Sequence, residues 1–95
     1  MSNTAQTLLA PTVHLNGTSE DALQEQVKDV IRALSETMEA MSRATPNARD
    51  YYPQGSSAFE LARNQRIAMW AQVEKMRGEF VAMSIAIDEQ KEVRR

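Results

Sequence analysis

The sequence predicts an all-α protein: an antiparallel two-helix hairpin with a short extended N-terminal segment, packed into a helical oligomer. Two long stretches carry apolar residues at helical spacing, and a short connector with two prolines separates them. Aromatic residues are 5% of the chain, which holds only three glycines and three prolines, a balance that favours helices over a β-sandwich or a β-barrel. The 95 residues have the length of one small domain.

The N-terminal end carries few structural signals. Residues 1–11 are small and polar apart from one pair of leucines, so we expect a flexible terminus ahead of a helical domain over residues 12–95. No apolar run approaches the roughly 20 residues that span a bilayer, and the start lacks the positively charged region of a secretory signal. We therefore expect a cytoplasmic protein with no membrane contact.

Residues 12–16 (TVHLN) alternate apolar and polar side chains. This pattern favours a short extended segment, with Val13 and Leu15 on one side and His14 and Asn16 on the other. The segment directly precedes the first predicted helix, so both polar side chains are expected near the start of that helix.

The first helix is predicted from about Ser19 to Arg43. Gly17 permits a sharp turn before it, and Thr18 or Ser19 supplies a hydroxyl that can cap the first backbone N–H groups. Pro46 cannot donate a backbone hydrogen bond and disfavours helix at the residue before it, so the helix is expected to end there. One face carries an apolar stripe with steps of three and four residues. The stripe consists of Leu23, Val27, Val30, Leu34, Met38 and Met41.

The second helix is predicted over residues 57–91. Ser57, with Glu60 three residues later, fits the capping box that often begins a helix. An apolar stripe then follows a strict heptad rhythm, so the two stripes are expected to pack along one seam. We interpret the six methionines of the chain as filling for this core. The second stripe consists of Met69, Val73, Met76, Phe80, Met83 and Ile87.

Further apolar residues lie outside both stripes. In a lone hairpin they would form a long exposed patch, which monomeric proteins rarely carry. We therefore expect a homo-oligomer, a dimer or larger. These residues are Ile31, Leu61, Ile67, Trp70, Val81 and Ile85.

The connector between the helices reads NARDYYPQG over residues 47–55. Its turn chemistry requires only the proline, asparagine and glycine residues, so several other side chains remain without a structural role. Arginine forks bind phosphate oxygens and aromatic faces stack on bases, which together suit a small nucleotide-like ligand. The candidate ligand-binding residues of this loop are Arg49, Asp50, Tyr51, Tyr52 and Gln54.

The charge of this region supports the same hypothesis, although a structural alternative stays open. Between positions 43 and 66 the chain has four arginines but only one aspartate and one glutamate. Within such a site Gln54 would contact a base edge and Asp50 a ribose hydroxyl. In the alternative, the two tyrosines pack over the end of the hairpin while Arg49 and Asp50 form a local ion pair.

Arg66 falls on the backward extension of the second apolar stripe from Met69. A buried guanidinium is costly unless it is paired. One interpretation packs its aliphatic stem in the seam and brings its charged end to Glu36 or Glu39 of the first helix. The other makes Arg66 a ligand for an anion held in a groove.

The motif HLNGTS forms a second candidate site before the first helix. His14, Asn16 and Thr18 are polar groups at a helix N-terminus, where backbone N–H groups and the helix dipole suit an anion. The alternative is simple capping, with His14 in solvent. The first helix separates this motif from the connector by about 35 Å, so both motifs can share a ligand only across a subunit boundary. An antiparallel dimer would bring the His14 end of one chain to the Tyr51 end of another.

No catalytic set is evident. The chain has no cysteine and a single histidine, so a Cys–His pair, a thiolate site and a histidine-rich metal site are all excluded. Phosphate-binding glycine loops are also missing. The net charge of −2 disfavours binding to a nucleic-acid polymer. We therefore expect a protein that is not an enzyme and uses no cofactor or metal.

The motifs TVHLNGTS and PNARDYYPQG together resemble a group of short phage and prophage proteins, with similarity over residues 12–90. In size and design the chain is more loosely similar to small helical phage proteins that sequester the cyclic nucleotide or cyclic ADP-ribose signals of bacterial immunity. That likeness implies a non-enzymatic oligomer that binds its ligand between subunits in the host cytoplasm. The alternative is a phage interaction module that inhibits or adapts a host or virion protein through an apolar surface around Trp70, Ile67 and Ile85.

Overall fold

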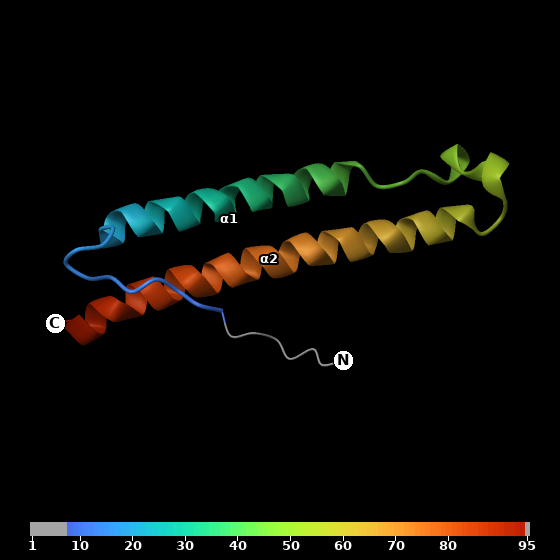
Figure 1. The fold of residues 1–95 in the computed structure, drawn as a ribbon. Helices are drawn as coiled ribbons and strands as arrows, with labels where there is room; N and C mark the ends of the chain where they lie inside the picture. The colour runs from blue at the N-terminus through green and yellow to red at the C-terminus, as the bar shows by residue number, and fades with distance from the viewer. Residues whose placement is uncertain (1–7, 95) are drawn as a thin grey trace, which may run out of the picture.

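The computed structural model describes residues 8–94, with side chains up to Lys91. Helix α1 (Glu20–Arg43) and helix α2 (Ala58–Arg94) flank two short 3-10 turns, η1 (Ala48–Asp50) and η2 (Tyr52–Gln54). The two long helices run antiparallel, side by side, and form a hairpin (Figure 1). The predicted all-α hairpin is therefore confirmed, and no strand occurs within the described residues.

Helix α1 begins and ends at capping interactions that its own sequence supplies. The Ser19 hydroxyl accepts a hydrogen bond from the backbone N–H of Ala22 at 3.2 Å, so Ser19, and not Thr18, is the N-cap. At the other end, the backbone N–H of Ala44 donates to the carbonyl of Met41. All six apolar positions predicted for the α1 stripe are buried or half-buried.

The seam on α2 is rotated relative to the prediction. Val73, Phe80, Met83 and Ile87 are half-buried or buried as expected, and Ile87 is fully buried. The predicted seam positions Met69 and Met76, by contrast, are 50% and 48% exposed, so the expectation that every methionine fills the core is wrong. The seam instead contains half-buried residues that the apolar stripe had excluded, namely Trp70, Arg77 and Ser84.

Polar bonds between the helices explain this rotation. Arg77 donates from Nη1 to the Ser35 hydroxyl at 3.0 Å. The Gln24 amide donates to the Ser84 carbonyl at 2.9 Å, and the Ser84 hydroxyl donates to Gln24 Oε1 at 2.7 Å. Because these partners satisfy one another across the seam, polar side chains occupy positions at which the sequence alone favoured methionine.

The segment before α1 is held against α2 by one side chain. The Gln90 amide donates to the Pro11 carbonyl and accepts from the Val13 N–H, both at 2.9 Å. The chain then turns, because the Gly17 N–H donates to the His14 carbonyl at 3.1 Å. Leu15 is consequently 97% exposed, and the predicted alternation through residues 12–16 is wrong beyond Val13. The predicted flexible N-terminus, residues 1–11, falls largely outside the described residues.

Candidate ligand groove at the loop end of the hairpin

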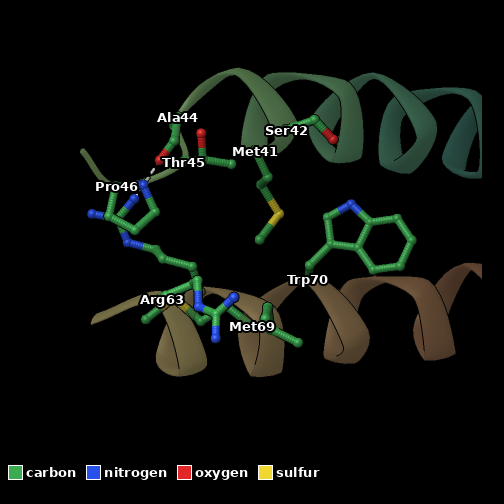
Figure 2. Close-up of a pocket in the computed structure, with 10 residues that line it drawn as sticks. Met41, Ser42, Ala44, Thr45, Pro46, Arg63, Met69 and Trp70 are labelled. Atoms are coloured by element: carbon green, nitrogen blue, oxygen red, sulfur yellow. Dashed lines mark hydrogen bonds between the residues drawn. The ribbon is translucent and has the colours of Figure 1, made fainter. Parts of the chain in front are cut away.

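An open groove lies at the end of the hairpin where the connector joins the two helices, called here the loop end. Its volume is about 530 Å³, and it is lined by the last turn of α1, the residues that follow it and the first turns of α2. Met41 from α1 and Trp70 from α2 point into the space between the helices (Figure 2). The remaining side chains at the groove include Pro46, Arg63, Arg66, Ile67 and Met69.

The groove lies at the point where α1 ends and α2 continues. Helix α1 has 24 residues and α2 has 37, so the first turns of α2 extend beyond the end of α1. On these turns Ala62 is buried and Phe59 is half-buried, whereas Leu61 is 59% exposed. Ile67 and Met69 lie level with the last turn of α1, and they are 57% and 50% exposed because they stand beside the seam and not in it. Both side chains line the groove.

The two arginines at the groove have different surroundings. The Arg66 guanidinium donates a hydrogen bond to the backbone carbonyl of Ala44, the C-cap of α1. A cation is favourable there because the last carbonyls of a helix carry partial negative charge. Arg63 is exposed and forms no hydrogen bond or ion pair with any described residue. Arg63 is thus available to a ligand, whereas Arg66 helps to hold the groove in shape.

The placement of Arg66 differs from both interpretations of the sequence. Its side chain is exposed and not buried in the seam, and its bond goes to backbone, not to Glu36 or Glu39. The physical reason is that α1 ends before it comes level with Arg66. The heptad extension therefore leads to a helix terminus with unpaired carbonyls, and a guanidinium satisfies one of them.

A second open hollow, of about 560 Å³, lies beside the connector. Tyr51, Tyr52 and Phe59 line it, with Tyr51 half-buried and Tyr52 exposed. The connector is shaped by its turn residues: the Asn47 side chain accepts from the Arg49 N–H at 3.1 Å, and Gly55 has φ of 116°, which favours glycine. The structure thus brings both predicted tyrosines to one hollow.

The other predicted residues of the connector are not brought to either cavity. Arg49, Asp50 and Gln54 are exposed and line neither the groove nor the tyrosine hollow. Within the described part of the chain, Arg49 and Asp50 also form no ion pair with each other, so the alternative of a local pair is wrong. These side chains are free to meet a ligand or a second protein chain only from outside the hairpin.

The HLNGTS motif lies at the opposite end of the hairpin (Figure 1). His14, Asn16 and Thr18 are exposed there, about 36 Å along α1 from the connector, as predicted from the length of the helix. The His14 imidazole lies against Gly17. A Cβ at position 17 would lie only 2.7 Å from Nε2 of His14. Within one chain, therefore, this motif and the groove do not form a common site.

The sequence pattern did not point to Arg63 or Trp70 as residues of a ligand site. Arg63 was counted only in the local positive charge, and Trp70 only outside the seam and in the alternative apolar surface for a partner protein. Their spacing carried a usable signal, since steps of three and four residues place Arg63, Arg66 and Trp70 on one face of α2. What the spacing does not show is that α1 ends in front of this face.

At the terminal end, meaning the end opposite the connector, the chain is held by an ion pair. Lys91 Nζ lies 3.3 Å from Glu20 Oε2 and 3.7 Å from Asp88 Oδ1. The hydrogen bond to Glu20 and the negative charge of Glu20, followed by that of Asp88, raise the pKa of Lys91 above its usual value. No group of three histidine or carboxylate side chains poised for a metal ion occurs among the described residues.

The geometry defines a helical hairpin whose loop end carries an open, mostly apolar groove with an unpaired arginine. Comparisons with protein-family models, with curated proteins and with solved structures find no match. None of the described helices is both long enough and apolar enough to cross a membrane.

Proposed function

We propose that this protein binds a small nucleotide-derived anion at the loop end and holds it without chemical conversion. One observation carries the proposal: Trp70 and the unpaired Arg63 line the same groove. An indole face can stack on a flat ring while a guanidinium binds a phosphate, so the pair matches both parts of a nucleotide. The volume of the groove lies within the range that drug-sized ligands occupy.

The groove is open, so a ligand held by one chain would keep much of its surface in water. We therefore propose that the protein acts as a homo-oligomer with ligand between subunits. In that arrangement Tyr52, Arg49 and Gln54 would face a neighbouring chain, which would contribute His14, Asn16 and Thr18. The resemblance to phage proteins supports a sequestering role against an immune signal in the host cytoplasm.

Thermal unfolding with a ligand panel tests this function. Cyclic dinucleotides, cyclic trinucleotides and ADP-ribose derivatives are each added at increasing concentration. A ligand present at 100 times its dissociation constant should stabilise the folded protein by about 2.7 kcal/mol, visible as a higher Tm. An unchanged Tm across the whole panel would count against the proposal.

Two matched variants locate the site. Arg63→Gln removes the unpaired charge at the groove and should weaken binding about tenfold or more. Arg49→Gln removes an equally exposed arginine from the connector, outside the groove. If Arg49→Gln weakens binding and Arg63→Gln does not, the ligand sits on the connector and the groove assignment fails.

A second candidate function is recognition of another protein, and the exposed apolar residues along α2 favour it. Ile67, Val81 and Ile85 are 57%, 39% and 53% exposed. Such a surface suits a helix of a host or virion protein. Val81→Ser would abolish partner capture in this case, while Arg63→Gln would have no effect on it.

A further inference from the structure

Three of the exposed apolar side chains lie on one flank of α2. Ile67 and Ile85 are 18 residues apart, which is five helical turns, so they point in the same direction about 27 Å from each other. Val81 lies within about 40° of that direction. This outer flank, defined by Ile67, Val81 and Ile85, is separate from the side held by the N-terminal segment, where Gln90 binds Pro11.

Gly78 lies on the same flank, in the interior of α2. A glycine in a helix interior is less favourable than alanine. A Cβ at this position would meet no atom within 4 Å, so no neighbour in the hairpin requires a glycine here. The missing side chain leaves room for the close approach of something outside the chain.

The charges of the hairpin are polarised along its length. The loop end, residues 43–66, has four arginines against Asp50 and Glu60. The terminal end has more carboxylates than cations, and a parallel neighbour would place like charge beside like charge. An antiparallel neighbour brings opposite charges together. The charged side chains that the structure describes at the terminal end are Glu20, Asp21, Glu25, Lys28, Asp29, Arg32, Asp88, Glu89 and Lys91.

We propose that the outer flank of α2 docks on the same flank of a second copy of this chain, antiparallel, about a two-fold axis level with Met76. That axis lies midway between Ile67 and Ile85. Ile67 of one chain therefore faces Ile85 of the second copy, and Ile85 faces Ile67. Because the same surface serves both chains, the dimer closes on itself.

The sequence between the two isoleucines is complementary to itself in this register. Ala71 comes level with Val81 of the second copy, so a small residue faces a large one. Glu74 comes level with Gly78 of the second copy. Because Gly78 has no side chain, the carboxylate of Glu74 has space to remain in water. The register thus accommodates the one charged residue of the central flank without burying it.

The dimer has a consequence for the groove, and this consequence alone rests on the proposed function. Ile67 belongs both to the outer flank and to the edge of the groove. The second copy would therefore wall that edge and bring its own His14 end to the groove. Dimer formation itself requires no ligand.

Cysteine cross-linking tests the register, because the natural chain has no cysteine. Chains with Ile67→Cys are mixed with chains with Ile85→Cys and oxidised. The mixture should give covalent dimers, whereas either variant alone should not, since like positions lie about 27 Å apart, far beyond disulfide reach. A mixture of Glu25→Cys with Arg43→Cys, also 18 residues apart but exposed on α1, controls for random collisions.

Cross-links formed by either variant alone would show that like positions meet, as in a parallel pairing, and would overturn the proposal. A mixture that cross-links no faster than its control, with a monomer mass in sedimentation of the unmodified chain, would also overturn it. As a second measure, Gly78→Leu should raise the dimer dissociation constant about tenfold or more through steric overlap, with unchanged helicity. Gln72→Leu places the same leucine side chain on α2 away from the outer flank and should have no such effect.

Discussion

The Arg66 guanidinium binds the carbonyl of Ala44, and this contact connects the first turns of α2 to the residue at which α1 ends. It lies beside the groove whose other walls include Met41 and Trp70. A single exposed side chain therefore helps to set the distance between the two helices at the point where the connector begins.

Replacement of Arg66 by glutamine should reduce the free energy of unfolding by about 0.5–1 kcal/mol, since the contact is exposed and involves one cation at a helix C-terminus. Urea denaturation measures the change. Arg49→Gln is the control, because its guanidinium binds no described residue and the variant should leave stability unchanged. Equal stability for both variants would show that the bond to Ala44 contributes nothing.

The bond between Arg77 and Ser35 should be visible in a double-mutant cycle. Ser35→Ala and Arg77→Met each remove the contact, which is part-buried in the seam. Because a hydrogen bond to a charged group is involved, we expect a coupling energy of about 1 kcal/mol from the four unfolding free energies. A coupling energy near zero would mean that the polar pair does not hold α2 in its observed rotation.

Ile87 and Ile85 form a matched pair for the hairpin core. Ile87 is fully buried, so Ile87→Ala should cost about 2–4 kcal/mol through lost burial and a cavity. Ile85 is 53% exposed within one chain, so Ile85→Ala should cost under about 1 kcal/mol in dilute protein. If the order of the two costs were reversed, α2 would face α1 with a different side.

The ion pair at Lys91 should make stability fall at high pH. Contact with Glu20 raises the pKa of Lys91 above its usual 10.5, so the folded state holds this proton more tightly than the unfolded state does. The contribution is therefore complete at neutral pH and is lost as pH rises above about 10.5 through the raised value. Tm measured from pH 9 to 12 should fall less steeply for Lys91→Met than for the natural chain.

A comparison with Lys28→Met controls for general alkaline effects. Lys28 is exposed on α1 and forms no ion pair with any other described residue. Its removal should leave the pH dependence of Tm between pH 9 and 12 unchanged. An identical change in the pH dependence of Tm in both variants would show that the effect does not come from the Lys91–Glu20 ion pair.

The sequence by itself determined the two helices, their order and the hairpin, because the signals for these are local. Ser19 caps the helix that follows it, Pro46 keeps the first helix from continuing, and Gly55 takes the positive φ of the connector. The six apolar residues of α1 also lie where their spacing placed them. Helix propensity, capping and turn conformation depend on residues a few positions apart, so sequence alone specifies them.

Only the tertiary structure decided which side of α2 meets α1 and where a groove opens. Two rotations of α2 satisfy heptad spacing, and the apolar choice through Met69 and Met76 is the one that the structure rejects. The outcome depends on bonds such as that from Arg77 to Ser35, between residues 42 positions apart. The groove likewise forms where the end of α1, with Met41 and Ala44, meets the turns of α2 that carry Arg66 and Trp70, so it exists only where two distant parts of the chain meet.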